Sequence, residues 1–172
     1  MEQLYAHKTG YDARDVLESL PPGLSEALLD SIHRSTVVQV PLFRDLHEDT
    51  IKEICLALKQ MRVVRGEFVY KEGTLARSMY LIEEGEVEIA RFEMPIGVLG
   101  EGAFFGEQAI CLDHIMWNRS AKAVQDTVLA FLTNVDIQRV AKEFPEVTVA
   151  FARVSARRSK MEAERMQVRP HT

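Results

Sequence analysis

The sequence predicts an α+β protein, in which helices flank a small antiparallel β-roll of the jelly-roll type. Three observations lead to this prediction. Apolar residues recur at helical spacing as far as residue 61. Between residues 62 and 133, short runs rich in Val, Ile, Phe and Tyr are separated by glycines, which is typical of a small roll or barrel. Helical spacing returns from residue 134.

Composition limits the possible functions. The chain has 172 residues, of which 47% are hydrophobic, enough for one sizeable core. Its net charge is −5, and an acidic chain is a poor candidate for nucleic-acid binding. Cys55 and Cys111 lie in apolar runs without a CxxC pattern, which indicates buried thiols in a reducing compartment. The sequence lacks a run of about 20 apolar residues, so we expect a soluble protein without direct membrane insertion.

The N-terminal part is predicted to be helical. Residues 12–20 form a short amphipathic segment that the Pro-Pro-Gly run at 21–23 stops. A second helix follows and ends at Pro41. Its apolar residues recur four apart: Leu24, Leu28 and Ile32. A third helix starts near Asp45, with Glu48 as its capping partner. Its apolar face is Ile51, Ile54, Cys55, Leu58 and Met61.

The glycine-rich middle of the chain is predicted to hold the strands. Their residues are 68–70, 79–82, 87–90, 121–124 and 128–132. The turns between them are marked by Gly66, Gly73, Gly85, Gly97, Gly100 and Gly102.

Two helices are expected after the roll. Asn134 is the predicted N-cap of the first, which Pro145 ends, and the second runs from about Glu146 towards Met166. The buried stripe of this last helix contains Val147, Ala150, Phe151 and Val154. Arg158 then stands where the spacing requires an apolar residue. Either its guanidinium reaches out to water, or it faces a polar ligand between this helix and the roll.

One pair of segments carries candidate chemistry. Gly106 precedes a short apolar helix, and the N–H groups at a helix start suit an anion. Glu107 is suited to accept hydrogen bonds from ligand hydroxyls. Arg119 can pair with two phosphate oxygens, and Ser120 supplies another donor. Singly, each residue has a simpler structural explanation, but together they predict a site for a phosphate and a hydroxyl.

These residues resemble the phosphate-binding cassette of the cyclic nucleotide-binding domain family. The cassette reads Phe105-Gly106-Glu107, a short apolar helix, a loop, and then Arg119-Ser120-Ala121. Residues 72–87 are similar to the early strands of that family's roll. Residues 20–43 resemble the end of the C-linker in hyperpolarisation-activated and cyclic nucleotide-gated cation channels. Residues 144–164 look like the junction of the B and C helices in those channels.

The resemblance implies a role for each candidate site residue. Gly106, Gln108 and Ala109 would present backbone N–H groups, and Glu107 would accept the ribose 2′-hydroxyl. Arg119 would pair with the cyclic phosphate, with Ser120 beside it. Ile89 and Leu99 would line the apolar side of the base pocket. On the lid helix, Arg158 would contact the purine. The remaining residues implied in the site are Phe105, Ala121, Met161 and Glu162.

The resemblance also implies a non-enzymatic regulatory function. The ligand would be cAMP or cGMP, and closure of the lid helix would gate or modulate an attached ion channel or ion exchanger. Residues 1–43 would be linker, 44–166 the binding domain and 167–172 a tail. The expected partners are the cyclic nucleotide, the transmembrane part of the parent protein, and further copies in a tetramer or dimer formed through the linker helices. The expected location is the cytoplasmic face of the membrane.

Some residues depart from the family pattern. The loop at residues 113–118 is longer than in the hyperpolarisation-activated channels and carries Met116 and Trp117. Asn118 stands where many members have a second basic residue, and Lys122 where a small residue is common. Ser120 could help a guanine base in its syn form, but the sequence leaves the choice between cAMP and cGMP open.

Three alternatives have different sequence requirements. A cupin-like metalloenzyme needs clustered ligands, and the histidines are scattered. They are His7, His33, His47, His114 and His171. A transcription factor like the catabolite activators needs a helix-turn-helix after the lid helix, and few residues follow Glu162. A ligand-free homology domain, as in ether-à-go-go channels, keeps the fold with its own chain in the pocket, but Arg119 argues for a working site.

Overall fold

The computed structural model describes residues 13–112 and 114–167. The strands are β1 (Lys59–Val63), β2 (Phe68–Tyr70), β3 (Ser78–Glu84), β4 (Val87–Arg91), β5 (Met94–Leu99), β6 (Phe104–Phe105), β7 (Ser120–Ala123) and β8 (Thr127–Thr133). The helices are α1 (Ala13–Glu18), α2 (Pro22–Gln39), α3 (Glu48–Ala57), α4 (Gln108–Cys111), α5 (Asn134–Glu143) and α6 (Glu146–Gln167).

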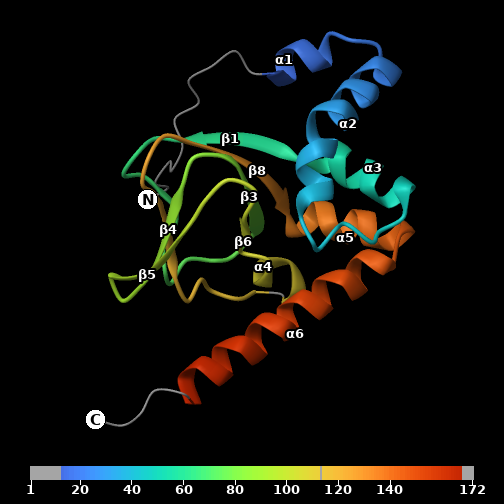
Figure 1. Cartoon of the computed structure of the whole chain (residues 1–172). Helices are drawn as coiled ribbons and strands as arrows, with labels where there is room; N and C mark the ends of the chain where they lie inside the picture. Colours follow the sequence, from blue (N-terminus) through green and yellow to red (C-terminus); the bar gives the residue numbers. More distant parts are fainter. Residues whose placement is uncertain (1–12, 113, 168–172) are drawn as a thin grey trace.

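Within these ranges the strands form two antiparallel four-stranded sheets. Their orders are β1-β8-β3-β6 and β2-β7-β4-β5. Figure 1 shows the sheets curled into a roll, with α2, α3 and α5 beside it and α6 running past α4 along the roll. The prediction of an α+β fold built on an antiparallel roll is confirmed. None of the helices in the described ranges is both long and apolar enough to cross a membrane.

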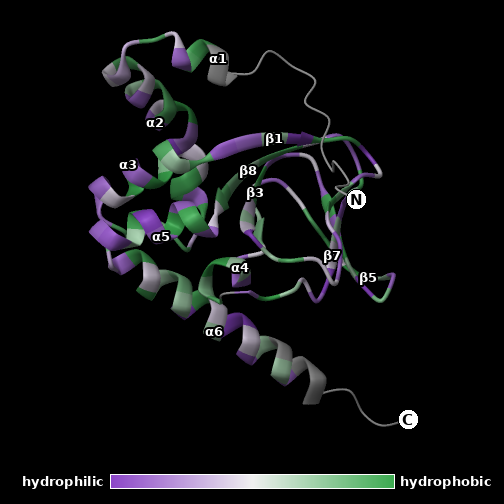
Figure 2. Cartoon of the chain, turned by 180° about the vertical axis from the view of Figure 1, so that it is seen from behind, coloured by the Kyte–Doolittle hydropathy of each residue, from purple (hydrophilic) through white to green (hydrophobic). Residues whose placement is uncertain are grey.

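Two hydrophobic clusters explain why the elements pack in this way. Strands β3 and β8 alternate their side chains between the clusters, as the pleat requires. Met79 and Leu132 belong to the cluster shared with the helices, whereas Ile82 and Leu129 face the cluster between the two sheets. Figure 2 shows that the central strand β8 is largely hydrophobic, whereas the edge strand β1 is largely hydrophilic.

The two N-terminal helices are confirmed within the described residues, which begin at residue 13. The second starts earlier than predicted, because Pro22 occupies its first turn, where a missing N–H costs nothing. Only part of its apolar surface is buried: Val37 is fully covered by the core. The exposed fractions of Leu24, Leu28 and Ile32 are 55%, 38% and 46%.

The third helix differs from the prediction at both ends. Its N-cap is His47, not Asp45, and the His47 side chain makes no capping hydrogen bond. The helix ends at Ala57, since Leu58 already has extended backbone angles. Met61 therefore lies in β1 and is not on the apolar face of the helix, so its spacing of three from Leu58 was wrongly interpreted as helical.

The five predicted strand segments are found, but the roll has more strands than predicted. β1 begins at Lys59, three residues before the predicted change to strands. β5 was missed because Pro95 and Gly97 lie within it and suggested a turn. An edge strand tolerates such residues, and β5 lies at the edge of its sheet.

Helix α5 has its N-cap one residue before the predicted position. Thr133, not Asn134, is the N-cap, and its hydroxyl accepts the Asp136 backbone N–H at 3.1 Å. The Asp136 carboxylate in turn accepts from the Thr133 N–H, completing a capping box, and forms an ion pair with Lys59 at 2.7 Å. Burial raises the pKa of the Asp136 carboxyl, but its bonds with Lys59 and Thr133 outweigh this and lower it below 3.8.

Replacing Thr133 by Ala is expected to lower the free energy of unfolding by about 1 kcal/mol, the usual effect of losing an N-cap side chain. Urea unfolding followed by circular dichroism measures this change. Asn134→Ala is the matched control and should leave the free energy of unfolding close to that of the wild type. A larger loss for Asn134→Ala than for Thr133→Ala would contradict the assignment of the cap.

Candidate functional site

Gly106 occupies a turn that no other residue fits well. Its φ angle is +79°, in the left-handed region that favours glycine. A Cβ atom there would lie 2.9 Å from the Trp117 ring and 3.1 Å from the carbonyl oxygen of Ser78. The glycine therefore lets the start of the cassette lie directly against Trp117 and β3. Strand β6 precedes this turn and the short helix α4 follows it.

Glu107 is a buried carboxylate that contacts α6. Its side chain is 3% exposed, and its Oε2 accepts a hydrogen bond from Nη1 of Arg158 at 3.0 Å. Nη2 of Arg158 donates to the carbonyl of Phe104 at 3.2 Å. The guanidinium carbon also lies 4.3 Å from the centre of the Phe104 ring, within the range of a cation–π contact. The guanidinium of Arg158 thus faces the roll, where its partners are Glu107 and Phe104, a contact that neither of the two alternatives left open for it included.

Arg119 and Ser120 lie together where β7 begins. Arg119 is half-buried, with its Nε atom fully covered, and the Ser120 hydroxyl oxygen accepts the Glu72 backbone N–H at 2.9 Å. Burial raises the pKa of the nearby Tyr70 phenol well above 10. The Glu107 charge raises it further, while those of Arg119 and Arg158 lower it.

The apolar candidates gather in the cluster between the two sheets. In the antiparallel register, Ile89 on β4 stands opposite Ala121 on β7. Ile89 and Leu99 are half-buried and pack against this cluster. Its fully buried members include the predicted site residues Phe105, Ala109 and Ala121. The structure therefore brings the apolar candidates to the same side of the roll as the cassette.

For three predicted site residues the structure gives less support, or leaves the side chain outside the described part of the chain. The Ala109 backbone N–H already donates to the Gly106 carbonyl at 3.1 Å, within the turn. Met161 is 48% exposed and is not brought into the cluster. The side chain of Glu162 lies outside the described residues. Gln108 is half-buried at the start of α4.

Sequence reasoning missed three aromatic residues at the site. Tyr70 and Trp117 stack face to face, with ring centroids 3.7 Å apart and an interplanar angle of 9°. Phe104 supports Arg158. The Trp117 loop is held by backbone bonds, since Trp117 N–H donates to the Thr74 carbonyl and Gly73 N–H to the Trp117 carbonyl. The tryptophan in the loop at residues 113–118 was the available signal, and it was interpreted only as a departure from the family.

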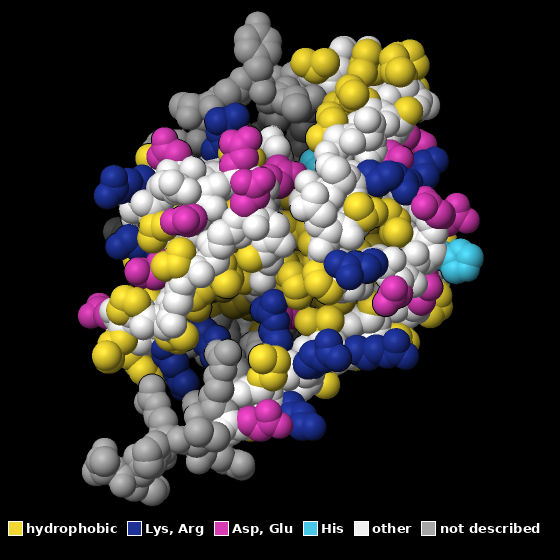
Figure 3. All heavy atoms as spheres, in the orientation of Figure 1, with side chains coloured by type: hydrophobic (Ala, Val, Ile, Leu, Met, Phe, Trp, Pro, Cys, Tyr) yellow, Lys and Arg dark blue, Asp and Glu magenta, His cyan; other side chains and the backbone are white. Residues whose placement is uncertain are grey.

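The site opens on the face shown in Figure 3. Hydrophobic side chains line a recess between the roll and α6 on this face, and Lys and Arg side chains lie beside it. In the part of the chain that the structure describes, no group of three or more His, Cys, Asp or Glu side chains could hold a metal ion. The recess thus combines apolar side chains with neighbouring cationic ones.

Comparison with known proteins identifies the domain. Residues 60–144 match the family of the cyclic nucleotide-binding domain. The human cyclic nucleotide-gated channel alpha-3 is 27% identical over 158 residues, which cover 87% of this chain and 22% of that protein. Mouse cyclic nucleotide-gated channel alpha-4 is 29% identical over 76% of this chain and 24% of its own length.

A candidate potassium channel protein of Rhodopseudomonas palustris is 34% identical over 143 residues, 77% of this chain and 34% of that protein. The chain thus spans about a fifth to a third of the length of these relatives. The matched region covers all the strands from Gln60 onward, the cassette and α5. The chain therefore belongs to the cyclic nucleotide-binding domain family and is similar to the corresponding regions of cyclic nucleotide-gated channels.

Proposed function

We propose that this chain is a regulatory module that binds cAMP or cGMP and controls an attached ion channel or ion exchanger. It carries out no catalysis. The observation that supports this most is the buried Glu107 carboxylate with its Arg158 partner, beside an apolar cluster that also contains Ala121, two residues after Arg119. A cyclic nucleotide has the matching parts: an anionic phosphodiester, a ribose hydroxyl and an apolar base.

Each group has a separate task in this proposal. Arg119 pairs with the cyclic phosphate, since a guanidinium can donate to two of its oxygens. The backbone N–H groups of Gly106 and Gln108 and the Ser120 hydroxyl add donors beside it. Glu107 accepts the ribose 2′-hydroxyl, and the apolar side of the pocket holds the base. Arg158, with Met161 and Glu162 further along the lid helix, faces the purine.

Helix α6 converts binding into a signal. Arg158 is the contact that ties α6 to the roll, through Glu107 and Phe104. A nucleotide that binds more tightly when α6 is docked shifts the population towards the docked state, and only this difference in affinity can drive the shift. Residues 1–43 then act as linker to the transmembrane part at the cytoplasmic face, and assemble copies into a tetramer or dimer. In this division residues 44–166 are the binding domain and 167–172 a tail.

One observation favours a second function, that of a ligand-free structural module. Arg158 already contacts Glu107, the carboxylate assigned to the ribose. In that case the chain's own side chain would satisfy the site, and cyclic nucleotides would not bind. Titration with cAMP and cGMP distinguishes the two functions directly.

Replacing Arg119 by Ala is expected to weaken cyclic nucleotide binding by about 10- to 100-fold. A hydrogen bond to a charged group is worth about 1.5–3 kcal/mol, and each 1.4 kcal/mol changes affinity tenfold. Isothermal calorimetry with cAMP and cGMP measures the change. Arg62→Ala, which removes an exposed arginine from β1, is the control and should bind like the wild type. Equal affinities for Arg119→Ala and the wild type would rule out this role.

Cyclic nucleotide is expected to shorten the mean distance between spin labels on the roll and on α6. Met94 on β5 is 72% exposed and Ser159 on α6 is also exposed, so both accept a label. Cys111 is replaced by Ser to avoid labelling it, while Cys55 is buried. Pulsed electron resonance gives the distances with and without nucleotide. Unchanged distances at saturating nucleotide would exclude lid closure as the signal.

A further inference from the structure

The first residue of α6 caps a helix far away in the sequence. Oε1 of Glu146 accepts the backbone N–H of His47 at 3.0 Å and the hydroxyl of Thr50 at 2.5 Å. His47 is the N-cap of α3, and Thr50 lies in its first turn. These bonds join residues 99 and 96 positions apart. The start of α6 is therefore bonded directly to the start of α3.

This contact supplies what α3 lacks. The first N–H groups of a helix have no acceptor within the helix, and a carboxylate also complements the positive end of its dipole. The His47 side chain makes no capping bond to the first turn. Glu146 accepts the N–H of the N-cap residue itself, the bond that a Glu at the third helical position makes in a capping box. The hydrogen bonds, with that from Thr50 first, lower the pKa of the Glu146 carboxyl below its usual 4.5. Glu146 is thus ionised at neutral pH.

Apolar packing strengthens the same connection. Val147 and Phe151, in the first turns of α6, are buried in the cluster that contains residues of α2 and α3. The Phe151 ring meets the Phe43 ring edge-on, with centroids 5.9 Å apart. Further along, α6 leaves this cluster, and Arg158 contacts the roll instead. Helix α6 therefore has two attachments, one to the cluster that the N-terminal helices share with β3 and β8, and one to the site at Glu107.

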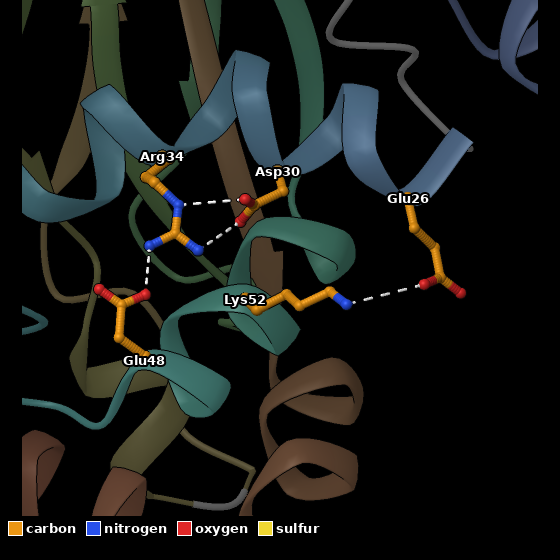
Figure 4. Close-up of polar contacts among 5 residues, drawn as sticks. All are labelled: Glu26, Asp30, Arg34, Glu48 and Lys52. Carbon is orange, nitrogen blue, oxygen red and sulfur yellow. Dashed lines mark hydrogen bonds and ion pairs between the residues drawn. The ribbon is translucent and has the colours of Figure 1, made fainter. Parts of the chain in front are cut away.

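The connection continues from α3 to α2. Arg34 on α2 donates to Glu48, the first residue of α3, at 2.6 Å. The same guanidinium is held by two bonds to Asp30 at 3.1 and 2.9 Å. Figure 4 shows these contacts, with Lys52 and Glu26 forming a second ion pair between the two helices at 3.9 Å. Glu48 follows His47 directly, so the cap and this ion pair meet at the same end of α3.

We propose that Glu146 is a positioning residue through which α6 holds α3, so that movement of α6 on the roll is passed to α3 and then to α2. The inference rests on the proposed function and deepens it by naming the contact that carries the movement. Glu146 does not touch the nucleotide in this account. Its loss therefore separates binding from transmission.

Two variants weaken the contact from opposite sides, Glu146→Ala by removing both hydrogen bonds and Thr50→Val by removing one of them. Glu146→Ala removes the acceptor, and Thr50→Val removes the hydroxyl while keeping the side-chain shape. Thr50→Ser keeps the hydroxyl and is the rescue variant. Glu143→Ala, at an exposed glutamate at the end of α5, is the control for loss of a carboxylate near α6. If Glu146→Ala does not fold, the comparison of Thr50→Val with Thr50→Ser still tests the proposal.

The experiment measures spin-label distances between Ser35 on α2 and Met94 on β5, with and without cAMP or cGMP, together with the nucleotide affinity. Glu146→Ala and Thr50→Val are expected to lose most of the nucleotide-dependent change in distance, while the affinity stays within about threefold of the wild type. Thr50→Ser and Glu143→Ala should keep both. A variant that is only less stable, with a lower melting temperature but the full distance change, would overturn the proposal. Loss of nucleotide binding in Glu146→Ala would also overturn it.

A second label pair separates this inference from the proposed function. Labels at Lys52 on α3 and Ser159 on α6 report the contact without nucleotide. Their distance distribution should broaden in Glu146→Ala and Thr50→Val, whether or not the wild type binds a cyclic nucleotide. An unchanged distribution would overturn the anchoring role. A wild type that binds neither cAMP nor cGMP would instead overturn the proposed function.

Discussion

The buried carboxylate of Glu107 is the constraint on which the arrangement of the site depends. An ionised carboxylate with 3% of its side chain exposed requires a charge partner and hydrogen bonds, because burying it unpaired is costly. Arg158 provides the partner from a distant helix, and the Phe104 ring and carbonyl hold that arginine in place. The ion pair thus connects the local turn after Gly106 to the position of α6.

This dependence explains why α6 is suited to report on the site. The start of the helix is buried in the apolar cluster shared by the N-terminal helices and strands β3 and β8, whereas Arg158, further along, meets the roll through polar contacts. Apolar packing is non-directional and hard to exchange, but an ion pair can give up one partner for another. A ligand whose hydroxyl bonds to Glu107 would therefore compete with Arg158 and change the position of α6. In the proposed function, Glu107 and Arg158 thus serve both recognition and signalling.

Residue patterns predicted most helices and strands of this molecule. They failed where a contact joins residues that are far apart in the sequence. The roll and its flanking helices follow from local alternation and spacing. The misfit of Arg158 in an apolar stripe left contact with water or with a polar ligand open, and the structure shows contacts with Glu107 and Phe104 instead. The cap of α3 could not be predicted, because its acceptor is Glu146 from another helix. The stacking of Trp117 on Tyr70 was missed for the same reason, since it joins a loop to a strand far apart in sequence. At the start of α5, Thr133 was overlooked as the N-cap because the next residue, Asn134, is also a good capping residue.

In the proposed function, Arg119 and Glu107 together hold a cyclic phosphate and its ribose. The decisive experiment is a calorimetric titration of the wild-type chain with cAMP, cGMP and the 2′-deoxy form of each. The account predicts saturable binding of one nucleotide per chain for cAMP or cGMP, and weaker binding of the matching 2′-deoxy nucleotide, because Glu107 then loses its hydroxyl partner. Absence of binding by both cAMP and cGMP, or equal affinity for the deoxy form, would contradict it.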